Sequence, residues 1–243
     1  MNRMTVLLFL AVLVTGCAQD PVPQKKGPCF TTVQEAAAEL LKDAQSEEEK
    51  LKRLFLFVRD EIRFDFVYPQ DVPAESVLRE GRGVCMQKAN LLVALVREAG
   101  FQARFRFMYV SKKALEDFLP DFAYKRWMDP FPHTFPEVFL EGKWISLDPT
   151  FDRELDNICR EKGVNFARYP VRDQVTIQFS SEVVIGHQQF FQVEGRTSFV
   201  GDDLAPLLSW SREHVPWYKR LLQPVIFKKA SDIVAQLRGE GTS

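Results

Sequence analysis

Residues 81–105 read GRGVCMQKANLLVALVREAGFQARF, and this stretch decides the fold. Two glycines break any preceding helix. Apolar side chains then cover most of the circumference of a helix predicted over residues 84–98, and such a helix is expected to be central and buried. Gly100 is a typical C-terminal cap, and the alternating pattern of residues 102–110 predicts a strand. Cys85 therefore stands at the start of the central helix.

Two further helices are predicted before this stretch. Thr31 or Thr32 caps a helix that runs to Lys42, because TVQE has the form of a capping box. Residues 46–64, SEEEKLKRLFLFVRDEIRF, place three glutamates in a first turn, where the helix dipole favours them, and repeat apolar residues at helical spacing. Prolines break residues 65–73 into a loop, and a helical turn follows at residues 74–80.

A β-hairpin is predicted after the strand. HTFPEVFL (residues 133–140) and WISLDPTF (residues 144–151) are two strands joined by a turn at Gly142. Pro136 predicts that the first of these strands is an edge strand or carries a bulge. Beyond the hairpin, the expected elements are strands at residues 174–179 and 188–195 and two helices after Leu204 that Pro224 separates.

The first 17 residues, MNRMTVLLFLAVLVTGC, are typical of an export signal. Arg3 precedes an apolar run from Met4 to Val14, which is shorter than the roughly 20 residues that a membrane span needs. VTGC resembles the bacterial lipobox, which implies that Cys17 is acylated; an ordinary secretory signal and an uncleaved anchor are the alternatives. The predicted divisions are a lipoprotein signal peptide (1–16), a tether (17–30), a core (31–160) and an extension of strands and helices packed on it (161–243).

Charge and cysteine count exclude several classes of function. A net charge of −1 gives no electrostatic support for nucleic-acid binding. The four cysteines include no CxxC pair, so neither structural zinc nor any other metal site is expected. In an oxidising compartment Cys29 and Cys159 are candidates for a disulfide, and Cys85 is then the odd thiol.

Chemistry is suggested by three residues in chain order: Cys85 at a helix start, His133 at the start of one hairpin strand, and Asp148 at the end of the other. A helix N-terminus lowers the pKa of a thiol from about 8.5. An imidazole then shuttles the proton, and a carboxylate fixes the imidazole tautomer. A cysteine at a helix start is by itself more often structural than catalytic, but this ordered set favours a nucleophile.

These segments resemble the transglutaminase-like superfamily. AESVLREGRGVCMQKANLLVALVREAGFQARF is similar to its cysteine helix and following strand, and HTFPEVFLEGKWISLDPTFD to its histidine and aspartate motifs. The resemblance implies a papain-like α+β fold, with the cysteine helix packed on an antiparallel sheet and extra C-terminal helices. It assigns Cys85 as nucleophile, His133 as general base and acid, and Asp148 as orienting acid. Phe135 replaces a tryptophan often found in the family.

The expected function is that of an exported, lipid-anchored cysteine hydrolase or acyltransferase that acts on peptide or isopeptide bonds. No cofactor is required by this chemistry. The expected partners are a protein or peptide substrate and, through the anchor, a membrane of the cell envelope, on the outer-membrane or periplasmic face in a Gram-negative host. Tyr68 and Gln70 are candidates for a side-chain oxyanion donor. The alternatives are a non-catalytic binding module of the same fold and an envelope-assembly protein.

Overall fold

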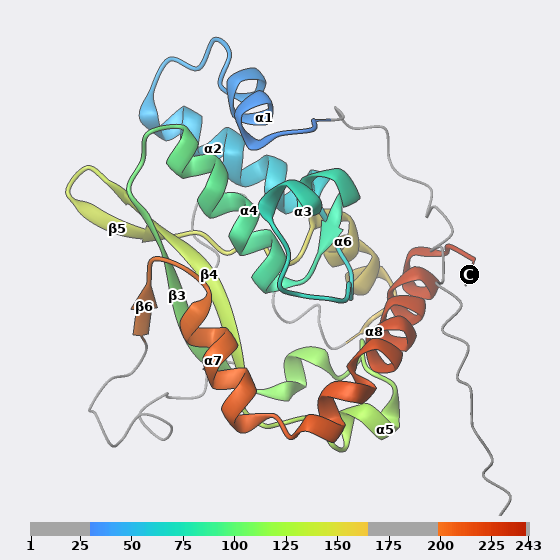
Figure 1. Cartoon of the computed structure of the whole chain (residues 1–243). Coiled ribbons are helices and arrows are strands. Elements are labelled where there is room, and N and C mark those ends of the chain that lie inside the picture. The colour runs from blue at the N-terminus through green and yellow to red at the C-terminus, as the bar shows by residue number, and fades with distance from the viewer. Residues whose placement is uncertain (1–29, 165–198, 242–243) are drawn as a thin grey trace, which may run out of the picture.

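The helix predicted to be central is α4 (Cys85–Glu98), in a computed structural model that describes residues 30–164 and 199–241. Ala89, Leu91, Leu92 and Leu95 of this helix have no exposed surface. Helices α1 to α3 pack on one side of α4 and a β-sheet packs on the other (Figure 1). This burial on two sides is what a helix with apolar residues around most of its circumference requires.

The predicted N-terminal helices are present, and Thr32, one of the two predicted caps, caps the first of them. The hydroxyls of Thr32, before α1 (Val33–Leu40), and of Ser46, before α2 (Glu47–Leu56), each accept the N–H group three residues on, at 3.1 Å. The sequence pattern did not predict that α2 continues into a π-helical segment, η1 (Phe57–Glu61). The remaining short elements before α4 are β1 (Arg63–Phe64), α3 (Ala74–Glu80) and β2 (Arg82–Gly83).

The sheet is antiparallel, with the strand order β5-β4-β3-β6, and it confirms the predicted α+β class. His133 is the third residue of its strand and lies opposite Met108 of the neighbouring strand. Asp148 lies two residues beyond the end of the last hairpin strand rather than within it. The strands are β3 (Ala103–Val110), β4 (Phe131–Leu140), β5 (Lys143–Ser146) and β6 (Phe199–Gly201).

Pro136 does not mark an edge strand, because β4 pairs with β3 on one side and β5 on the other. The carbonyl of Pro136 accepts the N–H group of Leu147 at 2.9 Å, beyond Ser146, the last residue of β5. The N and O atoms of one residue in a strand point to the same side. The missing N–H group of Pro136 therefore faces the place where β5 has already ended, which explains why a central strand accepts this proline.

The C-terminal helices divide at Pro216 and not at Pro224, so this part of the prediction is wrong. Pro216 directly precedes α8 (Trp217–Arg238), where a fixed φ of −54° suits a helix start. Pro224 lies inside α8 and leaves the helix continuous, since its buried face continues through Phe227, Ala230 and Val234. The other elements of this half are η2 (Lys112–Leu115), α5 (Asp121–Tyr124), α6 (Arg153–Glu161) and α7 (Ala205–His214).

The described part of the extension packs on the core. β6 pairs with β3, α7 crosses the sheet, and α8 lies beside α6 (Figure 1). The predicted strands at residues 174–179 and 188–195 lie outside the described residues, and the predicted domain boundaries stay predictions. Within residues 30–164 and 199–241, no helix combines the length and apolar character needed to cross a bilayer.

Candidate active site

The thiol of Cys85 is placed by a tight turn into α4. Gly83 has no room for a side chain, because a Cβ atom there would lie 2.9 Å from Cβ of Gln87. The side-chain oxygen of Gln87 accepts the N–H group of Val84 at 3.0 Å and so closes the first turn of the helix. The amides of a first turn have no partner within the helix. Cys85, which is partly exposed, is the first residue of α4 and so lies where backbone N–H groups have no partner within the helix.

His133 and Asp148 form a buried pair. Nε2 of His133 lies 2.7 Å from Oδ2 of Asp148, and each side chain is less than 5 % exposed. The other carboxylate oxygen, Oδ1, accepts the N–H group of Thr150 at 3.0 Å and its hydroxyl at 2.6 Å. Thr150 thus holds the carboxylate that holds the imidazole. The Asp-Pro-Thr spacing carried a signal for this turn, since Asp side chains commonly bond the backbone two residues on.

The imidazole of His133 favours its charged form. Burial, the largest single influence, lowers the pKa of His133. The charge and hydrogen bond of Asp148 and the hydrogen bond and charge of Cys85 together raise this pKa by more than burial lowers it. The net result is a pKa raised well above the usual value of about 6.5. At neutral pH His133 is therefore an imidazolium held between Asp148 and Cys85.

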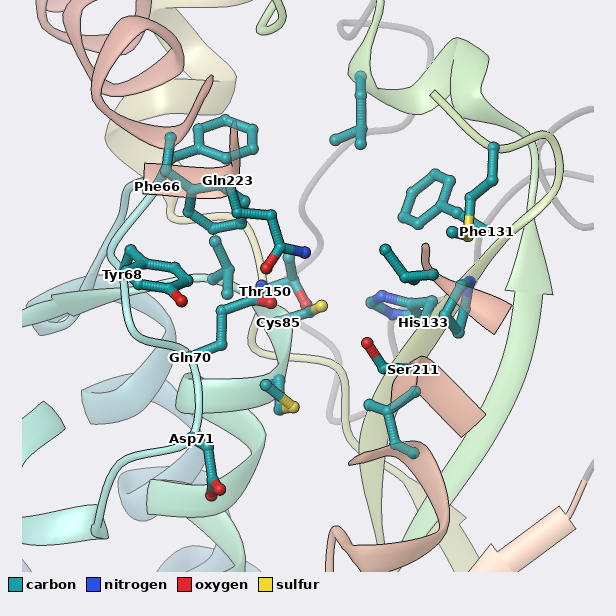
Figure 2. Close-up of a pocket in the computed structure, with 18 of the residues that line it drawn as sticks. Phe66, Tyr68, Gln70, Asp71, Cys85, Phe131, His133, Thr150, Ser211 and Gln223 are labelled. Carbon is teal, nitrogen blue, oxygen red and sulfur yellow. The ribbon is translucent and has the colours of Figure 1, made fainter. Parts of the chain in front are cut away.

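Cys85 and His133 face each other across one cavity, and Asp148 is bonded to His133. Cys85 comes from one wall, and its sulfur points toward the His133 ring on the facing wall (Figure 2). Because Nε2 of His133 is used by Asp148, Nδ1 is the nitrogen available to the thiol. This is the order of groups that a thiolate, a proton carrier and an orienting carboxylate require.

The two oxyanion-donor candidates line the same cavity. Tyr68 and Gln70 lie on the wall that carries Cys85 (Figure 2). Their loop is held against α4 by Gln87, whose side-chain amide donates to the carbonyl of Pro69 at 3.0 Å. One glutamine thus fixes both the start of the cysteine helix and the loop beside it.

A buried ionic network, which the sequence did not predict, lies next to the site. Asp152 caps α6 and accepts the N–H groups of Phe64, at 2.7 Å, and Leu155, at 2.9 Å. Arg238, at the end of α8, donates to the same carboxylate at 2.7 Å. Burial raises the pKa of Asp152, but Arg238, Lys88 and the backbone donor outweigh it and lower the pKa overall.

Lys88 completes this network from inside α4, three residues after Cys85. Its side chain is fully buried, and Nζ donates to the carbonyl of Arg59, in the π-helical segment, at 3.0 Å. Desolvation by burial is the main cause that lowers its pKa to about 7, against the opposing charges of Asp152 and Asp60. The site is therefore flanked by a buried lysine whose pKa lies well below the usual value.

The remaining predicted residues lie elsewhere. Cys159 is a buried free thiol on α6, and burial raises its pKa to about 12. Cys17 and Cys29 fall outside the described residues, so lipidation and the disulfide with Cys159 stay predictions.

The fold is α+β, with a cysteine at the start of a helix that packs on an antiparallel sheet. A hairpin brings a histidine and an aspartate together beside this cysteine. Residues 34–149 match the family model of the transglutaminase-like superfamily. This segment is therefore transglutaminase-like, as the sequence motifs predicted.

Comparison with individual proteins adds little detail. No curated protein matches the chain. A candidate cysteine protease from Cytophaga hutchinsonii, known from its crystal structure, is 21 % identical with a TM-score of 0.37. The match covers 57 % of this chain and 45 % of that protein, so the chain spans less than half the length of this relative.

Proposed function

We propose that the protein is an exported, lipid-anchored cysteine hydrolase or acyltransferase that cleaves amide bonds with Cys85, His133 and Asp148. The observation that carries the proposal is the buried His133–Asp148 pair, with the Cys85 sulfur facing the imidazole across an open cavity. The match of residues 34–149 to the transglutaminase-like superfamily supports a cysteine-based role.

In the proposed reaction the thiolate of Cys85 attacks the carbonyl carbon of an amide. The carbon–nitrogen bond breaks, and the leaving amine takes a proton from the His133 imidazolium, which leaves a thioester and a neutral imidazole. Water then attacks the thioester while His133 takes its proton. The carbon–sulfur bond breaks, and a carboxylic acid and the original ion pair result.

Two features of the site support the proposed attack geometry. The unpaired N–H groups in the first turn of α4 can donate to the oxyanion that forms on the carbonyl oxygen. Asp148 is fixed by Thr150 and accepts from one imidazole nitrogen only, which leaves the other directed at the thiol. Hydrolysis is proposed ahead of cross-linking because water is always present, whereas cross-linking needs a second site for an amine.

Thiol reactivity tests the proposed role of Cys85. We expect iodoacetamide to alkylate Cys85 readily at pH 6–7, because the imidazolium of His133 stabilises the thiolate. In His133→Ala the reaction should require the alkaline pH at which ordinary thiols ionise. The measurement is the rate of adduct formation against pH, by mass spectrometry of the intact and digested protein, with buried Cys159 as the internal control. Identical pH profiles for the two proteins would favour the binding-module alternative.

Lipid anchoring has its own test. We expect the full chain to fractionate with membranes and Cys17→Ser to appear in soluble or unprocessed form, because VTGC resembles a lipobox and the acyl chains would be attached at Cys17. The measurement combines fractionation with the mass of the mature N-terminus. Unchanged fractionation together with an N-terminus lacking acyl mass would contradict the anchor.

A further inference from the structure

We infer that the cavity beside Cys85 binds a bulky apolar group next to the carbonyl that the thiolate attacks, and that residues 205–227 set this preference. The inference rests on the proposed function, and it names the class of substrate for that site. It makes the substrate an amide whose acyl part carries an aromatic or aliphatic chain, and it disfavours amides whose acyl part is charged.

The wall of the cavity is mostly apolar and carries few charged side chains. None of the described residues that line it is lysine or arginine, and Asp71 is the only acidic one. Aromatic rings form much of the rest and contact one another: Phe66 packs against Phe227 with ring centres 5.5 Å apart, and Phe64 against Phe151 at 4.7 Å. A charged group placed here would lose its hydration without gaining a partner of opposite charge, apart from His133 and Asp71.

The cavity is small for a ligand site. The cavity holds about 290 Å³, which is near the lower end of the roughly 300–1,000 Å³ of typical ligand sites. This volume suits one side chain or a short acyl chain rather than several residues of a folded substrate. Since Cys85 and His133 face each other across this space, whatever fills it is adjacent to the reacting carbonyl.

Part of the cavity wall comes from the two C-terminal helices. Leu207, Leu208 and Ser211 of α7 and Phe227 of α8 line the cavity, and Ser211 faces it from the same side as His133 (Figure 2). Trp210, also in the lining, is braced by Tyr109 of β3 with ring centres 5.7 Å apart. All of the α7 and α8 residues lie outside the segment 34–149 that matches the superfamily. The superfamily segment therefore supplies the cysteine, the histidine and part of the cavity wall, and the two C-terminal helices supply another part of the wall.

The test uses N-substituted iodoacetamides, which react with the thiol itself and require no known substrate. In the full chain, we expect the rate constant for Cys85 alkylation, divided by that for glutathione, to rise about fourfold for each added methylene until the cavity is filled. The N-hexyl and N-benzyl reagents should therefore exceed the N-methyl reagent at least tenfold and show saturation. An N-carboxyalkyl reagent of similar length should show no gain.

Matched variants locate the preference. Ser211→Phe, which fills the cavity from α7, should bring the ratio of N-hexyl to N-methyl rates toward one. Gln223→Glu, a nearly isosteric change on the α8 wall, should lower the same ratio by placing a charge there. The control is Ser209→Phe, the same substitution two residues away on α7, where the hydroxyl bonds Glu213 outside the cavity and the ratio should be unchanged.

The outcomes separate this inference from the proposed function. Rapid, His133-dependent alkylation with no effect of the N-substituent would overturn the inference and leave the cysteine chemistry standing. A ratio that falls equally in Ser211→Phe and Ser209→Phe would show that α7 does not form the wall. A Cys85 thiol that resists every reagent would overturn the proposed function, and the inference with it.

Discussion

Asp148→Asn is expected to reduce turnover by roughly three to four orders of magnitude while leaving the fold intact. The carboxylate accepts from Nε2 of His133 at 2.7 Å, whereas an asparagine amide could donate to that nitrogen and select the wrong tautomer. The measurement is kcat for release of p-nitroaniline from an acyl anilide with an aromatic acyl group. KM should change far less than kcat, because Asp148 does not line the substrate cavity.

Variants around Asp148 show whether the three residues act as one unit. Thr150→Val removes the hydroxyl that donates to Oδ1 at 2.6 Å but keeps the carboxylate, so a smaller loss of kcat is expected. Cys85→Ala combined with His133→Ala should be no slower than either single variant, because groups that act together are not additive. Full activity in Cys85→Ser would contradict the nucleophile assignment.

Arg238→Met is expected to lower the free energy of unfolding by about 3–5 kcal/mol, because it leaves the Asp152 carboxylate buried without its main counter-charge. The two side chains are 3 % and 1 % exposed, and Arg238 also donates to the carbonyl of Phe64 at 3.3 Å. The measurement is urea unfolding followed by circular dichroism. The matched control is Arg53→Met, which breaks an exposed pair with Glu49 and should cost less than about 1 kcal/mol.

A double-mutant cycle isolates the ion pair from the loss of packing. Asp152→Asn keeps a residue that can cap α6 while it removes the buried charge. Combined with Arg238→Met, it should be destabilised by clearly less than the sum of the two single variants. Simple additivity would mean that Arg238 stabilises the protein through its packing and not through Asp152.

The sequence predicted the elements that carry Cys85 and His133 because local patterns encode these elements. Apolar periodicity with flanking glycines marks the Cys85 helix, and a hairpin with one tight turn brings the strand of His133 beside the residues that lead to Asp148. The antiparallel sheet and the α+β class followed from the same segments. The sequence did not predict the break at Pro216; it predicted a break at Pro224, a proline that the buried later face of α8 accommodates within one helix.

The substrate wall and the ionic network could not be predicted, because both depend on contacts between residues far apart in the sequence. Asp152 and Arg238 are separated by 86 positions and carry no local signal that they will meet. Lys88 sits within an apolar helix, and only the three-dimensional structure shows that the carbonyl of Arg59 receives its ammonium group. Periodicity identifies which side of an element is buried, but it does not identify what covers it.

The position of α7 and α8 after the reacting residues in the sequence has a consequence for biosynthesis. A ribosome makes Cys85, His133 and Asp148 before it makes the helices that close the cavity, and chains begin to fold from the N-terminus as they emerge. A growing chain thus holds its thiol for some time without the pocket that would select a substrate. Any chemistry that needs the complete cavity starts only after Phe227, the last residue of its lining, has been added. The order of synthesis therefore separates in time the appearance of the thiol from the completion of the cavity wall beside it.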